Sequence, residues 1–135
     1  MNVMTQEIGM LSKAIDLRAY RHQVLASNVA NADTPQYKAR DFDFRAAMQN
    51  AVAGRQEGGL ALATTASGHI SGGAAGGMPN LQYRAETQSA VDGNTVDMDT
   101  ERAQIADNAI QYEILTRLIS DKFSGMRAAL AGNQG

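Results

Sequence analysis

Hydrophobic residues recur every three or four positions in two long segments, one near each end of the chain. In the first segment, residues 5–32, the apolar stripe consists of Met4, Ile8, Leu11, Ile15, Leu25 and Val29. Arg18 and His22 occupy the two middle positions of this stripe. Steps of three and four residues fall on one face of an α-helix. The pattern predicts a long N-terminal helix whose broad, interrupted stripe contacts several partners.

The second periodic segment spans residues 97–131 and predicts a C-terminal helix of comparable length. Its main stripe consists of Ile105, Ala109, Tyr112, Leu115, Ile119, Phe123 and Met126. Asp97 or Asp99 is suited to cap the free amides at its start, and Gly125 or Gly132 to end it. Two long helices at opposite ends of a chain are expected to pair antiparallel, which leaves their outer apolar flanks for other subunits.

The residues between these helices carry three different patterns. Residues 33–53 begin with a turn and contain three of the seven aromatic side chains, Tyr37, Phe42 and Phe44. Residues 54–78 are rich in glycine, with eight glycines between positions 54 and 77, and predict a flexible segment. Residues 79–96 alternate apolar and polar positions and include a turn signal at Asp92-Gly-Asn, which predicts an extended stretch with a small hairpin. The predicted fold class is mainly α, with paired terminal helices and a short β-rich or irregular middle.

Composition narrows the function without naming it. The 135 residues suit one domain, and a net charge of −2 with 19% charged residues gives no basic face for nucleic acid or lipid. No cysteine, no tryptophan and only three phenylalanines are present. Disulfides are therefore excluded, and no cleavable signal or membrane-spanning run is expected. Much of the apolar fraction is alanine, which predicts a sparse core that neighbouring subunits complete.

Candidate catalytic or metal-binding groups are scattered. The two histidines, His22 and His69, lie 47 residues apart. The acidic cluster Asp92, Asp97, Asp99 and Glu101 lacks the ligand order of a calcium loop, and helix capping explains it better. The sequence therefore predicts no catalytic residue, no metal site, no cofactor and no enzymatic activity.

The most informative segment follows the first helix, from Asn28 onward. Asn28 and Asn31 share a helix face, and two interpretations stay open: polar residues tolerated near a helix end, or hydrogen bonds across a helix interface that fix its register. Pro35 disfavours helix at Thr34, so the helix stops there. Gln36 is expected to direct this turn toward type I or an extended path, because type II needs positive φ.

This segment, Leu25-Ala-Ser-Asn-Val-Ala-Asn-Ala-Asp-Thr-Pro-Gln-Tyr37, resembles the Asn-Ile-Ala-Asn-x-x-Thr-Pro-Gly-Tyr signature of bacterial flagellar rod and hook axial proteins. Gln36 stands where that family usually has glycine. The continuation Lys38-Ala-Arg-Asp-Phe-Asp-Phe44 and the compact spacing before Pro35 resemble the proximal-rod subunits within the family. A second similar stretch covers residues 92–101 and leads into the C-terminal helix.

The resemblance implies a structural subunit of the flagellar basal-body proximal rod, which self-assembles through its terminal helices around the export channel. The residues implied in the assembly motif are Asn28, Asn31, Thr34, Pro35, Tyr37, Phe42 and Phe44. Those expected in helix packing are Leu11, Ile15, Leu25, Val29, Ile105, Tyr112, Leu115, Ile119 and Phe123.

The partners implied are other rod subunits, the rod–ring adaptor, the membrane-ring protein and the flagellar type III export apparatus, with no nucleic acid or small-molecule substrate. The implied location is the periplasmic part of the basal body, reached without a cleaved signal peptide. Two alternatives remain: another flagellar axial subunit, or a cytoplasmic helical adaptor forming a coiled-coil oligomer. Uninterrupted heptads would favour the adaptor, and Arg18 with His22 on the stripe weigh against it.

Overall fold

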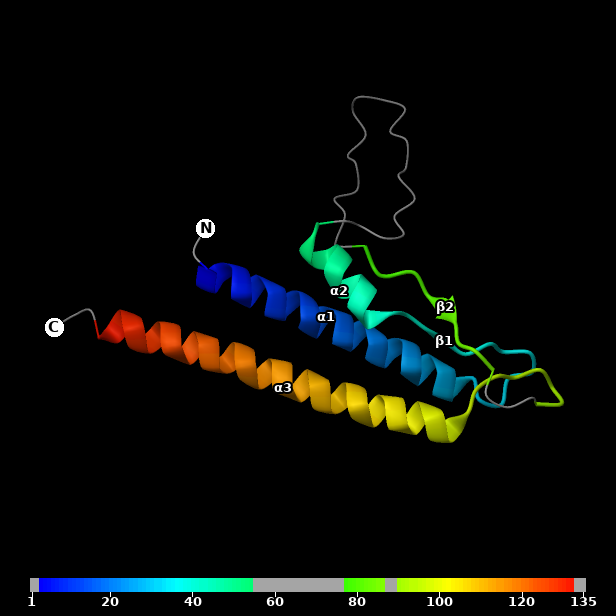
Figure 1. The fold of residues 1–135 in the computed structure, drawn as a ribbon. Coiled ribbons are helices and arrows are strands. Elements are labelled where there is room, and N and C mark those ends of the chain that lie inside the picture. The colour runs from blue at the N-terminus through cyan, green and yellow to red at the C-terminus, as the bar shows by residue number, and fades with distance from the viewer. Residues whose placement is uncertain (1–2, 55–76, 87–89, 133–135) are drawn as a thin grey trace, which may run out of the picture.

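Two long antiparallel helices form the body of the molecule (Figure 1). The computed structural model describes residues 3–54, 77–86 and 90–132. Its elements in chain order are α1 (Val3–Ala30), β1 (Arg40–Asp41), α2 (Phe44–Val52), β2 (Gln82–Tyr83) and α3 (Met98–Ala131). Nearly all of the predicted flexible segment, residues 54–78, lies outside the described residues. Within the described part, no helix has the length and apolar character needed to cross a membrane.

The predicted pair of long helices is confirmed, as is the mainly α fold class. α1 and α3 lie side by side along their length, and α2 packs on the side of α1 that faces away from α3 (Figure 1). The Asp97 side chain caps α3 by accepting hydrogen bonds from the amides of Asp99 and Thr100. The helix continues through Gly125 and ends at Gly132, whose amide donates to the Ala128 carbonyl at 2.9 Å.

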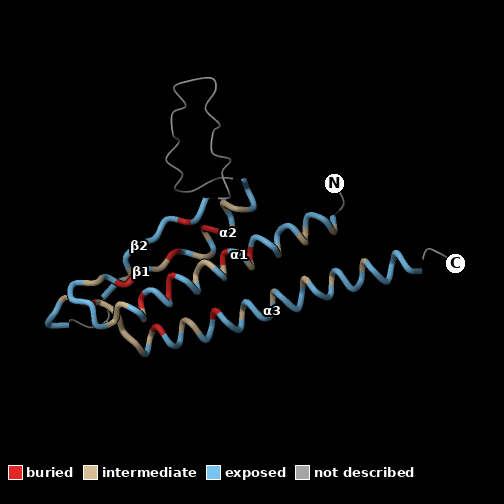
Figure 2. The backbone as a smooth tube through the Cα atoms, turned by 180° about the vertical axis from the view of Figure 1, so that it is seen from behind, coloured by how far each residue is buried: buried red, intermediate tan, exposed pale blue. Residues whose placement is uncertain are grey.

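Burial is concentrated at one end of the helix pair, next to the middle segment (Figure 2). The buried residues of α1 are Ala14, Leu17, Val24, Leu25 and Asn28. α3 buries only Glu101 and Asn108, and both are polar. In the described chain, no residue of α1 before Ala14 or of α3 after Asn108 is fully buried. The far halves of the two helices are therefore loosely packed, as the sparse composition predicts.

A small apolar core joins α1 to the middle segment. Leu17, Phe42 and Ala47 form it, and the Tyr20 ring stacks on Phe42 with 5.6 Å between centroids. Ala47 belongs to α2, a helix that the sequence interpretation of residues 33–53 missed. Asp43 caps this helix by accepting from the Ala46 amide at 3.0 Å. The apolar residues Phe44, Ala47, Met48 and Ala51 of α2 follow steps of three and four, a helical period that the interpretation of this segment did not use. A helix of nine residues is marginal by itself, and its core contacts stabilise it.

Part of the extended stretch predicted within residues 79–96 is present as β2, but the described residues of this stretch pair with a distant segment and form no local hairpin. β2 pairs antiparallel with β1, far earlier in the chain, with Arg40 opposite Tyr83. Ala39 accounts for the difference, because its carbonyl accepts from the Arg84 amide at 2.9 Å and its amide donates to the Thr95 hydroxyl at 2.8 Å. The segment before β1 thus lies between residues 84 and 95 and takes the hydrogen bonds that a local hairpin would use.

The expectation for Gln36 is also wrong, because this residue adopts φ +60°. Its amide donates to the Asp92 carbonyl at 2.9 Å, and the Tyr37 amide donates to the Thr34 carbonyl at 3.3 Å. Positive φ at the third residue of a turn is the type II requirement, which a glycine would meet without strain. The contact with the Asp92 loop therefore outweighs the roughly 1–2 kcal/mol of left-handed strain.

Candidate assembly site

Asn28 lies at the centre of a buried polar network and is fully buried. Its Oδ1 accepts from the Arg40 amide at 3.0 Å, and its Nδ2 donates to the Arg40 carbonyl at 2.7 Å. A carboxamide that satisfies both backbone groups of one residue replaces a neighbouring strand on the free edge of β1. The Asn28 amide also donates to Glu101 of α3 at 3.3 Å, so it links three elements.

Asn31 makes local contacts instead. Its Nδ2 donates to the Ser27 carbonyl at 2.8 Å, and its Oδ1 accepts from the Thr34 hydroxyl at 3.2 Å. The sequence left two interpretations open. Asn28 fits one of them, a hydrogen bond across a helix interface, and Asn31 fits the other, a polar residue tolerated near a helix end. The shared face does not give the two residues a shared role.

Asn94 ties the end of α1 to the segment that precedes α3. Its Nδ2 lies within 2.9 Å of the Asn31 and Ala32 carbonyls and 2.7 Å of the Thr34 carbonyl. These carbonyls belong to the turn that follows α1, so this side chain holds the turn from 60 residues away in sequence. The Thr34-Pro35 turn is therefore held by a residue outside the motif.

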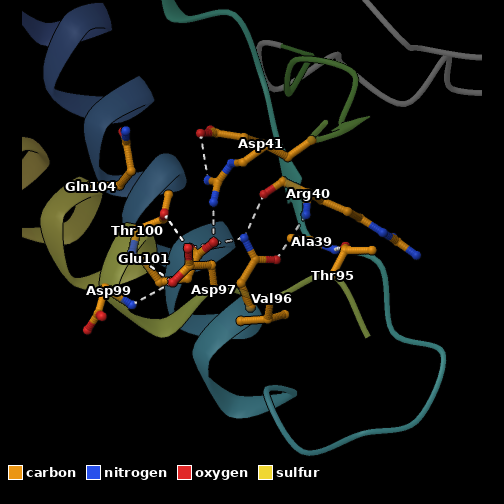
Figure 3. Close-up of polar contacts among 12 residues, drawn as sticks. Ala39, Arg40, Asp41, Thr95, Val96, Asp97, Asp99, Thr100, Glu101 and Gln104 are labelled. Carbon is orange, nitrogen blue, oxygen red and sulfur yellow. Dashed lines mark hydrogen bonds and ion pairs between the residues drawn. The ribbon is translucent and has the colours of Figure 1, made fainter. Parts of the chain in front are cut away.

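Charged side chains extend the network around Asn28. Figure 3 shows two of them, Asp41 and Glu101, beside Arg40 and Gln104. Arg21 of α1 holds Asp41 through two hydrogen bonds, Nε–Oδ1 at 3.0 Å and Nη2–Oδ2 at 2.8 Å. Its Nη2 also donates to Gln104 of α3 at 2.9 Å. Arg84 bridges Asp41, at 3.0 Å, and the fully buried Glu101. Two cations and two carboxylates thus balance inside a junction of four elements, as buried charges require.

The electrostatics of this junction favour the charged forms of its members. Burial by itself would raise the pKa of Asp41, but hydrogen bonds from Arg21, the Phe42 amide and Arg84 bring it below its ordinary value. The hydrogen bond to Asp41 raises the pKa of Arg21 despite its partial burial. The two-point contact between Arg21 and Asp41 contributes to both shifts, so the pair is ionised at neutral pH.

Arg18 occupies a different environment. Burial, followed by repulsion from Arg21, lowers its pKa. Its guanidinium lies 3.8 Å from the Phe44 ring centroid, and its Nη1 reaches Asn108 of α3 at 3.4 Å. Asn108 in turn donates to the Arg18 carbonyl at 2.9 Å. The predicted stripe thus holds a cation that packs on an aromatic ring, whereas His22 is exposed.

The aromatic residues of the motif fall in three environments. The Tyr37 hydroxyl donates to Asn28 at 3.2 Å, Phe42 is buried in the core, and Phe44 is half-buried beneath Arg18. Thr34 and Pro35 are exposed at the end of the molecule. The motif residues are therefore brought together around the Asn28 network, except for the turn, which projects outward.

The residues expected in helix packing divide by position. Leu25 is fully buried, whereas Leu11, Ile15, Val29, Ile105, Leu115 and Ile119 are half-buried. Tyr112 and Phe123 are 41% and 50% exposed. The role of Tyr112 and Phe123 in helix packing stays a prediction, and it concerns contacts with other subunits.

Sequence reasoning missed the charged members of the network and Asn94. Arg21, Asp41 and Arg84 carry no periodic or motif signal of their own, and Glu101 was assigned to the helix N-terminus. A partial signal existed for Glu101, because it is aligned with the α1-facing side of α3, seven residues before Asn108. Among the described residues, no cluster of three or more potential ligands could hold a metal ion.

The fold is a pair of long helices with a buried polar network at one end and exposed apolar flanks, which is typical of a structural subunit. Known proteins of similar sequence agree with this class. No family model matches the chain. It is 46% identical over 123 residues to the flagellar basal body rod protein FlgB of Salmonella typhimurium, covering 89% of both chains. The corresponding protein of Escherichia coli is 45% identical over 125 residues, covering 90% of this chain and 91% of the relative.

A more distant relative extends the match. The FlgB protein of Cereibacter sphaeroides is 36% identical over 126 residues, which cover 93% of this chain and 94% of that relative. The chain therefore belongs to the family of flagellar basal body rod proteins FlgB, and it is a structural protein of the flagellar rod.

Proposed function

We propose that the chain builds the proximal segment of the rod by self-assembly, with helices of many copies packed around the export channel. The observation that carries this proposal is the loosely packed half of the helix pair. There α3 exposes Tyr112 and Phe123 on one flank of its contact with α1. Large exposed apolar side chains on a helix flank mark a contact surface. The role is structural, with no catalytic step.

The partners that this proposal implies are neighbouring rod subunits, the rod–ring adaptor, the membrane-ring protein and the export apparatus. The chain would travel through that apparatus without a cleaved signal peptide and function on the periplasmic side. The same proposal needs no cofactor, nucleic acid or small-molecule substrate. Deletion of the gene should give immotile cells whose membrane ring lacks a rod, with rescue by the intact gene.

The direct test replaces Tyr112 or Phe123 with Asp. Both side chains are exposed, so the monomer should keep its helical circular dichroism, while a charge in the contact surface should abolish rod formation and swimming. The control is Ser120→Asp, an exposed polar position on the same helix, which should assemble normally. Swimming and intact rods in both aromatic variants would contradict the proposal.

A further inference from the structure

A shallow apolar groove lies between α1 and α2, on the side of α1 away from α3. Its apolar lining consists of Met10, Phe44, Met48, Val52 and Ala53, and its volume is about 530 Å³. Met10 is 47% and Val52 52% exposed, so the lining is open to solvent. A groove of this kind is suited to a row of branched aliphatic side chains on a helix.

Among the described residues, the charge at the edge of this groove is positive. Arg45 is the one charged residue of the described chain that lines it, and this side chain is exposed. Lys13 lies close by, because its ammonium donates to the Ala51 carbonyl of α2 at 2.8 Å. The groove thus offers an apolar floor with basic edges, which favours an acidic amphipathic helix.

α3 carries such a face, separate from the Tyr112 and Phe123 flank. Ile110, Ile114 and Leu118 are 59%, 47% and 45% exposed and recur every four residues. At 3.6 residues per turn, Asp107 and Asp121 fall within the same arc of about 80°. Both carboxylates are exposed. Arg117 borders this stripe, but its guanidinium is held by Glu113 at 2.5 Å.

We propose that the α1–α2 groove of one copy binds the Ile110–Ile114–Leu118 stripe of a second copy. The fit is complementary in both character and charge: aliphatic side chains enter an apolar groove, and Asp107 and Asp121 approach Arg45 and Lys13. This inference rests on the proposed self-assembly and specifies one of its contacts.

The contact is heterologous, because the groove and the stripe are different surfaces of one chain. α2 and α3 lie on opposite sides of α1, so a copy that donates its stripe still has a free groove (Figure 1). Heterologous contacts that do not close a ring build open helical arrays. A rod requires that property, and a closed dimer would lack it.

The test uses the absence of cysteine from the chain. The double variant Val52→Cys/Ile114→Cys would be expressed in cells deleted for the gene and treated with a short bis-maleimide. Denaturing gels should then show a ladder of dimers, trimers and larger species. Two strains supply the comparison: one co-expressing the single variants Val52→Cys and Ile114→Cys should give dimers only, and each single variant alone should remain monomeric.

A matched control pairs Val52→Cys with Ser120→Cys, which lies about 120° from Ile114 around α3. It should give no ladder. Motility separates the two proposals, because it reports the rod itself. Motile cells in which the double variant stays monomeric, or in which either single variant forms dimers efficiently, would overturn the groove contact while leaving the rod function intact. If the intact gene, expressed in the same deleted cells, restores neither rods nor swimming, and the double variant gives no cross-links, both the rod function and the groove contact are overturned.

Discussion

The carboxamide of Asn28 replaces a missing strand. It satisfies the amide and the carbonyl of Arg40 together, so β1 pairs with β2 on one edge and with a helix side chain on the other. Aspartate offers no amide donor, and leucine offers neither group. The asparagine of the motif is thus explained by backbone hydrogen bonding inside the monomer, before any neighbour is considered.

Replacing Asn28 with Ala should destabilise the monomer by roughly 2–3 kcal/mol, because buried backbone groups of Arg40 and the Glu101 carboxylate lose a partner. Urea unfolding followed by circular dichroism measures this change. Asn31→Ala is the matched control, and its loss should stay below about 1 kcal/mol, since its contacts are local and more exposed. Equal losses in the two variants would contradict the network as the origin of the effect.

Gln36 supplies the opposite experiment, a gain of stability. Gln36→Gly should stabilise the protein by up to about 1 kcal/mol. Glycine adopts positive φ without strain, and this gain is partly offset because glycine has more conformational freedom in the unfolded chain. Gln36→Ala keeps a Cβ and should bring no gain. The two variants differ by one methyl group, so thermal unfolding of the pair isolates the backbone strain. A destabilised glycine variant would show that the Gln36 side chain matters more than its φ.

Among the elements, α1 and α3 are the part that the sequence predicts well. Their apolar stripes are long, and the Asp97 cap is a local signal, so no distant contact is needed to recognise them. α2 carries the same kinds of local signal, the Asp43 cap and a short apolar period, but over only nine residues. The β1–β2 ladder was not predictable in the same way, because Ala39 defines it through partners elsewhere in the chain. Helix length and sequence distance therefore separate the elements that the sequence predicts from those that it does not.

The network that joins these elements was equally hidden. Arg84 and Glu101 look like surface charges in the sequence, and only the fold shows that one neutralises the other in a buried junction. The motif gave the position of the candidate site, since Asn28 and Tyr37 lie within it. The charged side chains that complete this site lie on other parts of the fold: Asp41 on β1, Arg84 just after β2 and Glu101 on α3.

Acid should loosen this junction. The pKa of Asp41 is lowered in the folded protein, so the unfolded chain binds more protons near the ordinary aspartate value of about 3.9. Its stabilising contribution is complete above that value and is lost as the pH falls through the lower, folded pKa. The free energy of unfolding should therefore drop between about pH 5 and pH 2. Urea titrations across this range measure the drop.

Asp41→Asn should lower the free energy of unfolding at pH 7 and flatten its decline toward acid. The control is Asp16→Asn, an exposed carboxylate on α1, whose pH profile should match that of the wild-type protein. A steep acid decline that persists in Asp41→Asn would assign the effect to other carboxylates.

At the scale of the whole molecule, stability should be graded along the helix pair. The buried residues of α1 begin at Ala14 and those of α3 end at Asn108, while the opposite ends touch through half-buried side chains, including the Lys122–Glu7 ion pair at 2.6 Å. Local opening costs least where few apolar contacts must break. The two ends of the pair are therefore expected to behave differently in the free monomer.

Amide hydrogen exchange of the monomer tests this gradient. Amides near Leu25 and Asn108 should exchange slowest, and those of residues 3–11 and 119–131 fastest, within seconds to minutes of dilution into deuterium oxide. In assembled rods the fast group should become protected, because neighbouring copies cover it. Uniform protection along both helices of the monomer would contradict a subunit that neighbours complete.

The buried pairing of Arg84 with Glu101 also constrains how this protein changes over evolutionary time. Loss of Arg84 leaves the buried Glu101 carboxylate without a cation, at a cost of roughly 3–5 kcal/mol, a large share of the stability of a domain this small. Loss of Glu101 leaves Arg21 and Arg84 to share the single charge of Asp41. A lineage can therefore leave this arrangement only by altering both positions in close succession, or by passing through a weakened intermediate. The two positions should be inherited as a unit, although seventeen residues separate them in the chain.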